Sequence, residues 1–304
     1  MRVVRPAAAT PQVASWAEQA AASVFFTFFP ADCRICGSPL LTISRLPVCV
    51  DCLHSLRPVT GRLCSICGEA LAYAASADLE ESARCGLCRL VPPRFERAVA
   101  YGSYEGALRD LVHLLKFGEV MPATQVLGCL LAEAIVALEP SLPAGTIVAV
   151  PVPLHANKQS QRGFNQAELI ARAALKRLSR ASLGENRFTL SAHALTRVRD
   201  TGSQIGRSRE QRLQNLRGAF KVADATSIAN RNVLVIDDVY TTGATASECA
   251  RVLRRAGAAK VWVATVARTM RESNIVAKEF LQGQNADLSR EQEENRLSRA
   301  AAQG

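Results

Sequence analysis

Two adjacent carboxylates and a threonine-rich loop follow an apolar run late in the chain. Residues 233–236 (VLVI) are four β-forming residues, typical of a strand buried on both faces. Asp237 and Asp238 come next, and residues 241–245 (TTGAT) lead into a helical pattern. The amides and hydroxyls of such a loop, with a helix N-terminus, can hold a phosphate. Carboxylates can hold ribose hydroxyls or a hard divalent cation. The stretch therefore predicts a site for a phosphorylated sugar, and the alternative is a Rossmann-like turn with solvated acids.

Eight of the ten cysteines fall in four C-x-x-C pairs, which are Cys33/Cys36, Cys49/Cys52, Cys64/Cys67 and Cys85/Cys88. Paired thiols at this spacing chelate one metal ion. A glycine after Cys36 and another after Cys67 would let each knuckle turn back toward its sulfurs. The pairs predict two Cys₄ zinc sites that supply much of the local folding free energy. In the simplest assignment the first two pairs share one zinc ion and the last two share the other, and an interleaved assignment stays open. The remaining Cys129 and Cys249 are expected to be small buried hydrophobes.

Composition indicates a globular protein with anionic partners. The 304 residues suffice for one α/β domain and a smaller module, and 48% of them are hydrophobic. The net charge of +10 favours phosphorylated substrates, nucleic acid, or both. Paired metal-type cysteines fit a reducing cytoplasm. Residues 12–29 predict an amphipathic helix within an N-terminal segment, 1–30. Their apolar run is too short to cross a bilayer, so we expect no membrane span.

The middle of the chain alternates helical and strand patterns. Pro92 and Pro93 mark the exit from the cysteine-rich segment, residues 31–91. Apolar residues at helical spacing from Leu108 to Leu115 predict a helix that stops near Gly118, in which His113 is interpreted as a packed histidine. Lys116, at its end, is either solvated or faces a phosphate. A second, largely buried helix is expected over 121–138.

Two loops are expected at the same edge of the sheet as the acids. Residues 146–150 (TIVAV) predict the first buried strand, and Pro151, Val152 and Pro153 stiffen the turn after it. The loop that carries Arg162, Asn165 and Gln166 precedes an amphipathic helix. Ligands of open α/β sheets bind beyond the carboxyl ends of the strands, which points both loops toward Asp237 and Asp238.

Residues 192–220 are rich in arginine, beginning with Arg197 and Arg199. Few apolar anchors predict a mobile excursion that could close over a pyrophosphate, and a solvated helix face is the alternative. Residues 260–268 predict a last buried strand. The polar tail, 271–304, is expected to be disordered or a frayed helix and is assigned no role.

The order of these motifs resembles the ComF/GntX family. The motifs are the zinc knuckles, Y-x-G-x-L-R with L-K-F-G, P-V-P-L, R-G-F-N-Q, the arginine-rich segment and VLVIDDVYTTGAT. The last of them resembles, along thirteen positions, the signature that binds phosphoribosyl pyrophosphate (PRPP) in type I phosphoribosyltransferases. Family members combine a double zinc ribbon with a phosphoribosyltransferase-type domain and are associated with DNA uptake in competence.

The resemblance implies a type I phosphoribosyltransferase fold over residues 95–270. This fold is α/β, with a five-stranded parallel sheet flanked by helices and a small hood near residues 95–140. Asp237 and Asp238 would meet the ribose hydroxyls, directly or through Mg²⁺, and would be the catalytic pair. The 5′-phosphate would lie on Thr241, Thr242, Gly243, Ala244 and Thr245. Pyrophosphate would lie near Pro151, Val152 and Pro153, with Arg162, Asn165, Gln166, Arg197 and Arg199 close by.

Two functions of different class follow from the sequence. The first is a PRPP-binding protein that transfers phosphoribosyl to an acceptor that no segment identifies. The second is a non-enzymatic protein of the competence machinery that handles single-stranded DNA through the same phosphate site. Strong basic charge and two zinc ribbons favour the second, and an aromatic content of 5% favours phosphate contacts over base stacking.

Overall fold

The computed structural model describes residues 31–40, 44–71, 83–180, 187–201 and 209–270. The helix expected over residues 12–29 and the tail 271–304 lie outside these ranges. The chain divides into two compact units between Leu56 and Arg57. The described part of the first unit contains two cysteine knuckles and the short helix α2 (Val50–His54). The second unit contains the other two knuckles, helix α3 (Gly86–Leu90) and the α/β domain.

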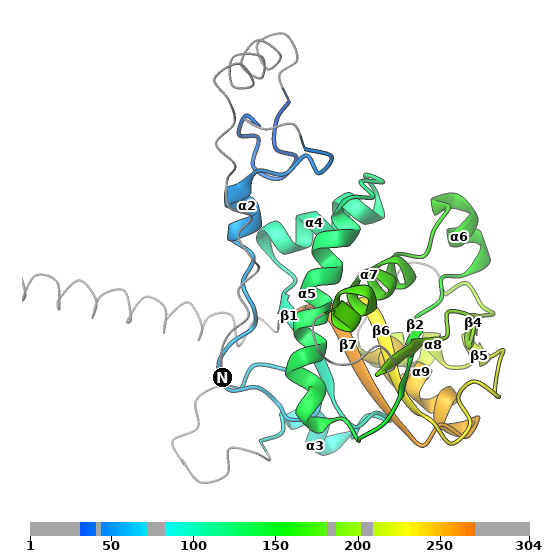
Figure 1. Cartoon of the computed structure of the whole chain (residues 1–304). Coiled ribbons are helices and arrows are strands. Elements are labelled where there is room, and N and C mark those ends of the chain that lie inside the picture. The colour runs from blue at the N-terminus through cyan, green and yellow to red at the C-terminus, as the bar shows by residue number, and fades with distance from the viewer. Residues whose placement is uncertain (1–30, 41–43, 72–82, 181–186, 202–208, 271–304) are drawn as a thin grey trace, which may run out of the picture. The chain divides into compact units, whose positions relative to one another are not determined.

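A five-stranded sheet forms the centre of the second unit, and all its strand pairs are parallel (Figure 1). The strand order is β1-β7-β6-β2-β3. The strands are β1 (Ala98–Ser103), β2 (Ile147–Pro151), β3 (Phe188–Leu190), β6 (Asn232–Tyr240) and β7 (Lys260–Arg268). This arrangement confirms the predicted α/β class with a parallel sheet and flanking helices.

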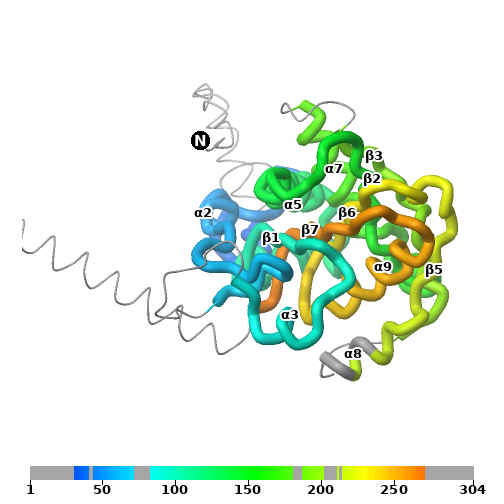
Figure 2. Tube along the Cα trace, turned by 90° about the horizontal axis from the view of Figure 1, so that it is seen from below, coloured from blue at the N-terminus to red at the C-terminus, as the bar shows by residue number. Residues whose placement is uncertain are grey.

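Helices cover both faces of this sheet. The helices that pack on its strands are α5 (Ala123–Leu138), α7 (Gln166–Arg180) and α9 (Ala244–Arg255). Helix α4 (Gly106–Lys116) packs on α5 and β1, and α8 (Arg209–Leu216) packs on α9. The 3-10 turn Glu139–Ser141 follows α5, and α6 (Ala156–Arg162) follows β2. Figure 2 shows α5 and α7 on one side of the strands and α9 on the other. Both faces of β2, β6 and β7 are therefore buried, which explains their continuous apolar runs.

Helix α5 fills the space between α7 and strands β1 and β7. Within the described residues, the segment Ala123–Ser141 is the one helical stretch long and apolar enough to cross a membrane. Its Leu127, Leu131 and Ile135 are fully buried, and 56% of the stretch is buried inside the fold. The buried helix expected over 121–138 is thus confirmed as a core helix of the α/β domain.

Two strands differ from the sequence-based expectations. Strand β1 precedes β2 and pairs with β7, although residues 146–150 were expected to form the first strand. Strand β6 continues to Tyr240, beyond the predicted end at Ile236, because its pairing with β7 extends from Asn232↔Lys260 to Tyr240↔Arg268.

The arginine-rich segment is ordered where the structure describes it. Strands β4 (Leu195–Arg197) and β5 (Phe220–Val222) form an antiparallel ribbon outside the main sheet, with α8 between them in the chain. Buried Leu195, Leu216 and Phe220 anchor this ribbon in the core. The two strands at the base of the predicted excursion are therefore packed against the core. Residues 202–208 of the same segment lie outside the described ranges.

Candidate functional site

Strand β6 delivers the two acids to the carboxyl edge of the sheet. Asp237 lies opposite Thr265 of β7, and its Oδ1 accepts a hydrogen bond of 2.9 Å from the amide of Asp238. Asp237 is partly buried, and Asp238 is only 4% exposed. Two carboxylates at adjacent positions of a buried strand repel each other, so they need a cationic partner.

Lys116 supplies one such partner from the last turn of α4. Its Nζ lies 2.7 Å from Oδ2 of Asp238, and both side chains are mostly buried. Burial alone would lower the pKa of Lys116, but attraction to Asp238 raises it above its ordinary value. The lysine therefore stays charged and faces a carboxylate, in place of the solvent or the phosphate that the sequence left as alternatives.

Asp237 has a raised pKa, about 7. Its buried surroundings are the largest cause, and repulsion from Asp238 adds to it, while Lys116 and Arg197 act in the opposite direction. The acid pair is thus poised to lose a proton near neutral pH. A divalent cation or a ribose hydroxyl would be a favourable neighbour for the carboxylates once both are ionised.

The threonine loop, residues 241–245, joins β6 to α9. Gly243 caps the helix with a positive φ of 77°, a conformation that side-chain-bearing residues rarely adopt. Helix α9 begins at Ala244, so Ala244 and Thr245 lie in its first turn. The first amides of a helix have no acceptor within the helix and carry its positive dipole end. The loop, Asp237 and Val152 together line one small cavity.

The proline turn after β2 lies at the same edge of the sheet. Pro151 pairs with Ile236 in the sheet register, so the turn is next to the acids. Asn165 fastens this turn, because its Nδ2 donates to the carbonyl of Val152 at 3.1 Å and its Oδ1 accepts from the amide of Ala167. Asn165 thus joins the turn after β2 to the start of α7, and its predicted place beside a ligand stays a prediction.

The predicted arginines occupy different environments. Arg162 donates to Oε1 of Gln166 at 2.6 Å and stacks over the exposed ring of Phe117. Arg197 stacks over Phe220 and donates to Thr201. Burial lowers the pKa of Arg197 below its usual value, and attraction to Asp200 and Asp237 acts in the opposite direction.

Arg199 donates to the carbonyls of Asn215 and Arg217 and so joins the segment after β4 to the segment before β5. Arg197 therefore lies within electrostatic reach of the acid pair, whereas Arg199 braces the backbone.

His113 matches its predicted packing role. Its Nε2 lies 2.8 Å from the hydroxyl of Tyr104, and its ring packs edge-on against Phe117. Cys249 is fully buried, as predicted, and burial raises the pKa of its thiol well above the usual value. Cys129 is only half-buried, because it lies at the margin of the packed face of α5.

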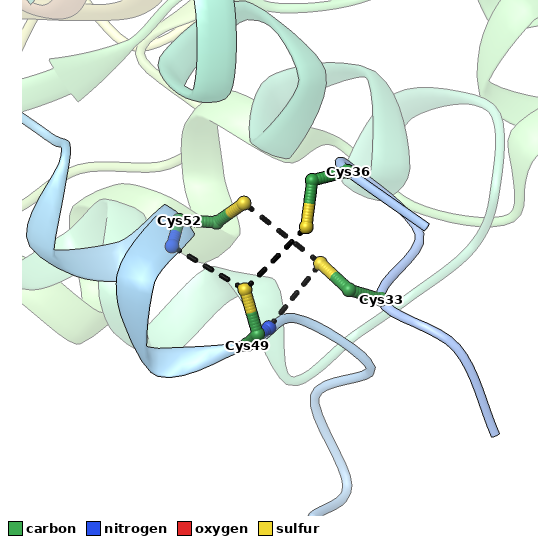
Figure 3. Close-up of side chains that lie close together, drawn as sticks. All are labelled: Cys33, Cys36, Cys49 and Cys52. Atoms are coloured by element: carbon green, nitrogen blue, oxygen red, sulfur yellow. Dashed lines mark hydrogen bonds between the residues drawn. The ribbon is translucent and has the colours of Figure 1, made fainter. Parts of the chain in front are cut away.

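The eight paired cysteines form two clusters of four, and Figure 3 shows the first of them. The first is Cys33, Cys36, Cys49 and Cys52, and the second is Cys64, Cys67, Cys85 and Cys88. Sulfur–sulfur distances include 3.6 Å (Cys36–Cys49), 3.9 Å (Cys33–Cys52) and 3.7 Å (Cys67–Cys85). Zinc–sulfur bonds of about 2.3 Å place the thiolates of a tetrahedral site about 3.8 Å apart, so both clusters fit zinc. The sequential assignment is thus confirmed.

The two clusters repeat the same local geometry. Gly37 and Gly68 have φ values of 75° and 69°, as the knuckle turns require. In each cluster the amide of the third cysteine donates to the sulfur of the first at 3.3 Å, from Cys49 to Cys33 and from Cys85 to Cys64. Their burial differs, because all four cysteines of the second cluster are buried and Cys36 of the first is exposed.

The second cluster is built into the α/β domain through Arg268, the last residue of β7. Its guanidinium donates to the carbonyl of Cys67 and pairs with Glu69 at 2.5 Å, and both charged side chains are almost fully buried. The same guanidinium lies 5.2 Å from the ring centre of Tyr240. The hydroxyl of Tyr240 in turn packs directly against Gly243. One chain of contacts thus connects the second zinc cluster to the threonine loop.

Sequence reasoning did not find Glu69, Tyr240 or Arg268. The available signal was an arginine at the carboxyl end of a buried strand, Arg268, in the same position that Asp237 and Asp238 occupy on β6. A charged residue there must meet a partner, but the sequence could not identify a glutamate in a distant cysteine knuckle.

Comparison with known proteins gives a consistent result. Residues 24–89 match the Double zinc ribbon domain family. A DNA utilization protein YhgH of Salmonella typhi is 32% identical over 243 residues, which cover 79% of this chain and 98% of that protein. Competence protein F of Haemophilus influenzae is 30% identical over 249 residues, which cover 80% of this chain and 98% of that protein.

A more distant relative is competence protein ComFC of Bacillus subtilis, which is 28% identical over 70% of this chain and 80% of that protein. Among solved structures, one described as the allosteric regulatory enzyme of purine biosynthesis aligns with 48% of this chain and 26% of its own, at 19% identity and a TM-score of 0.29. That overlap is too small to carry a functional argument.

Proposed function

The chain belongs to the ComF family, together with YhgH and the competence proteins F and ComFC, and from this premise we propose that it binds PRPP with Mg²⁺. One observation carries the proposal. A buried strand ends in two acids and continues directly into a glycine-capped, hydroxyl-rich helix N-terminus. This arrangement offers a site for a phosphate and a site for a cation or diol on one continuous backbone segment.

The threonine loop would hold the 5′-phosphate. The first amides of α9 have no acceptor within the helix, and Thr241, Thr242 and Thr245 bring three hydroxyls to the same loop. Residues 241–245 contain no side chain with a formal charge, so the phosphate would be bound by hydrogen bonds and the helix dipole.

The acids would hold the ribose and the cation. Asp237 and Asp238 supply the oxygen ligands that Mg²⁺ prefers, usually with retained water molecules. Lys116 neutralises Asp238 while no cation is bound. On binding, the lysine would be free to move toward the pyrophosphate, since a hard cation would take over its role at the carboxylate.

The pyrophosphate would lie beside the proline turn 151–153. Arg162 and Arg197 would supply the cations at this end, Gln166 would orient Arg162, and Asn165 and Arg199 would hold the surrounding backbone. In phosphoribosyl transfer the bond from ribose C1 to pyrophosphate breaks and a bond to the acceptor forms. Cations at the leaving pyrophosphate and carboxylates near the positive ribose would stabilise that transition state. The acceptor is not assigned.

The pKa of Asp237 gives a test of the proposed cation site. Below about pH 7 this carboxyl binds a proton, which competes with a cation, so PRPP–Mg²⁺ affinity should rise on going from pH 6 to pH 8. The variant Asp237→Asn should lose this part of the pH dependence, with affinity reduced by about tenfold or more at pH 8. Calorimetric titration at both pH values measures the effect. Protonation of PRPP itself affects the wild type and the variant equally, so the difference between their pH dependences isolates Asp237. The same pH dependence of affinity in the wild type and in Asp237→Asn would contradict the proposal.

The same variant should be more stable than the wild type when no ligand is bound. The folded pKa of about 7 exceeds the unfolded value of about 4, so the wild type loses stability as the pH rises through this window. The amide introduced by Asp237→Asn does not ionise, so the melting temperature of the variant should exceed that of the wild type at pH 8, with the difference shrinking toward pH 4. A variant that melts lower at pH 8 would show that Asp237 does not carry a burial penalty.

A second function, the handling of single-stranded DNA, is favoured by a different observation. The net charge is +10, and the relatives YhgH, F and ComFC are named for DNA utilization and competence. Phosphate-backbone binding follows naturally from such charge. The PRPP site and a DNA-binding surface are compatible in one chain.

A further inference from the structure

Six arginines line a groove that lies apart from the acid pair and the threonine loop. The groove has a volume of about 810 Å³ and runs between the polypeptide around the second zinc cluster and helix α9. Its basic lining residues are Arg84, Arg94, Arg217, Arg251, Arg254 and Arg255. Glu96 is the one carboxylate among the residues that line it. We call this feature the arginine groove.

Among the described residues, one of the six arginines of the groove forms an ion pair, and Arg217 also interacts electrostatically with Glu248. Arg251 pairs with the buried Glu248 at 2.7 Å, and that glutamate also accepts from the amide of Gly218. Within the described ranges, no carboxylate lies within ion-pair distance of the other five guanidinium groups. Arginines that face each other across a concave surface repel one another, so this surface favours an anionic partner.

The dipole of helix α9 explains only some of the six arginines in the groove. Arg254 and Arg255 lie in the last turn of α9, where cations complement the helix dipole. Arg84 lies in the zinc-binding segment, Arg94 follows its exit prolines, and Arg217 follows α8, so the dipole of α9 does not account for them. Three separate chain segments therefore bring positive charge to one groove.

The type of side chain indicates phosphate groups as the ligand. The planar guanidinium fork matches phosphate oxygens, often with two parallel hydrogen bonds. Phe95 is the one aromatic residue in the lining, but it is 5% exposed and packs edge-on against Tyr240. Phe95 therefore offers no exposed ring on which the bases of a nucleic acid could stack. The groove would contact the sugar–phosphate backbone of such a ligand, and these contacts would not depend on base sequence.

The shape indicates a single strand. A groove whose two walls both carry arginine admits a thin, easily bent chain of phosphates, whereas a duplex is stiff and has its phosphates on a convex surface. Six arginines, five of which have no ion pair with a described carboxylate, also exceed what a single phosphate requires. We propose that the arginine groove binds the sugar–phosphate backbone of a single-stranded nucleic acid.

This surface is independent of the proposed PRPP site. Helix α9 carries the threonine loop at its N-terminus and Arg251, Arg254 and Arg255 in its second half, so the two sites occupy different ends of one helix. The proposal therefore holds or fails separately from PRPP binding. It also differs from the expectation that nucleic acid would use the same phosphate site.

The test compares two triple variants of the full-length, zinc-loaded protein. Arg94→Gln, Arg254→Gln and Arg255→Gln together remove three groove charges. Arg172→Gln, Lys176→Gln and Arg180→Gln remove three charges from α7, on the opposite side of the sheet (Figure 2). Both variants have the same net charge, so their difference isolates the position of the charge.

The probes are fluorescent oligomers of about 20 nucleotides, namely oligo-dT, oligo-rU and a duplex of the same length, with polyglutamate as competitor. Anisotropy is measured between about 50 and 200 mM salt. We expect the groove variant to bind oligo-dT about 10- to 100-fold more weakly than the α7 variant, with a salt slope smaller by about two. Oligo-rU should behave like oligo-dT, because the contacts are to phosphates.

Two controls test whether the groove variant is folded. If the wild type binds PRPP, the groove variant should bind PRPP with the same affinity. If the wild type does not bind PRPP, the melting curve of the groove variant should match that of the wild type. Equal oligo-dT affinity in the two triple variants would overturn the proposal. So would tighter binding of the duplex than of the single strand, or displacement of oligo-dT by polyglutamate at an equal charge concentration.

Discussion

Replacing Cys88 with serine is expected to lower the melting temperature of the protein by on the order of 10 °C and to weaken PRPP binding by about tenfold or more. All four cysteines of the second zinc cluster are buried and belong to the hydrophobic core of the α/β domain. The loss of one thiolate should release the ion, leaving three thiols without their shared partner in that core. Zinc content, thermal melting and PRPP titration measure the three consequences.

The effect on PRPP would be transmitted through Arg268. This side chain binds the carbonyl of Cys67 and the carboxylate of Glu69, and it supports Tyr240, which packs on Gly243. Glu69→Gln tests the same connection with all eight cysteines intact. It leaves Arg268 with a buried and less compensated charge, which typically costs about 3–5 kcal/mol.

Cys36→Ser is the matched control, because Cys36 is exposed and lies in the other compact unit. It should also release about one zinc ion, but with the main melting transition of the α/β domain and its PRPP affinity unchanged. Equal losses of PRPP affinity in Cys36→Ser and Cys88→Ser would show that the second cluster has no special connection to the threonine loop.

Gly243→Ala is the second change with a large expected effect, a loss of PRPP affinity of about 100-fold, or roughly 3 kcal/mol. A Cβ at this position would overlap the hydroxyl of Tyr240, and the φ of 77° is unfavourable for alanine. The loop amides would therefore shift away from the position in which they meet a phosphate. Calorimetric titration with PRPP and Mg²⁺ measures the loss.

Gly257→Ala separates this local effect from general backbone strain. Gly257 also has a positive φ, 98°, but a Cβ there meets its nearest neighbours at 3.8 Å and beyond. This variant should lose stability and retain PRPP affinity. If both alanine variants bind PRPP like the wild type, the loop does not hold its phosphate.

The parts of the structure that depend on local pattern were predictable. The apolar run before Asp237 indicated the buried strand, and the paired cysteines followed by glycine indicated the zinc knuckles. Helix α5 was recognisable because its apolar residues surround most of its circumference. These features follow from residue periodicity and spacing, which need no knowledge of distant contacts.

The parts of the structure that depend on pairing between distant segments could not be predicted from the sequence. Strand β1 is half-buried and acquires its strand partner, β7, only near the end of the chain. Strand β6 keeps its two acids within the ladder, although aspartate is unfavourable in strands, because β7 continues beside them.

The partners of charged side chains were the hardest to predict. The sequence singled out Lys116 but not its contact with Asp238, and it gave no indication that Arg268 reaches Glu69. The arginines also divide between two places, since Arg197 lies near the acids and Arg217 lines the arginine groove. Charge alone does not specify position, because long side chains can reach partners on several elements.

The most direct test of the central claim is a calorimetric titration of the zinc-loaded, full-length protein with PRPP in the presence of Mg²⁺. The wild type is compared with the double variant Asp237→Asn, Asp238→Asn, whose folding is checked by its zinc content and melting curve. We expect the wild type to bind one PRPP per chain and the double variant to bind about 100-fold more weakly or not measurably. A wild-type protein that binds PRPP no better than the double variant would contradict the account.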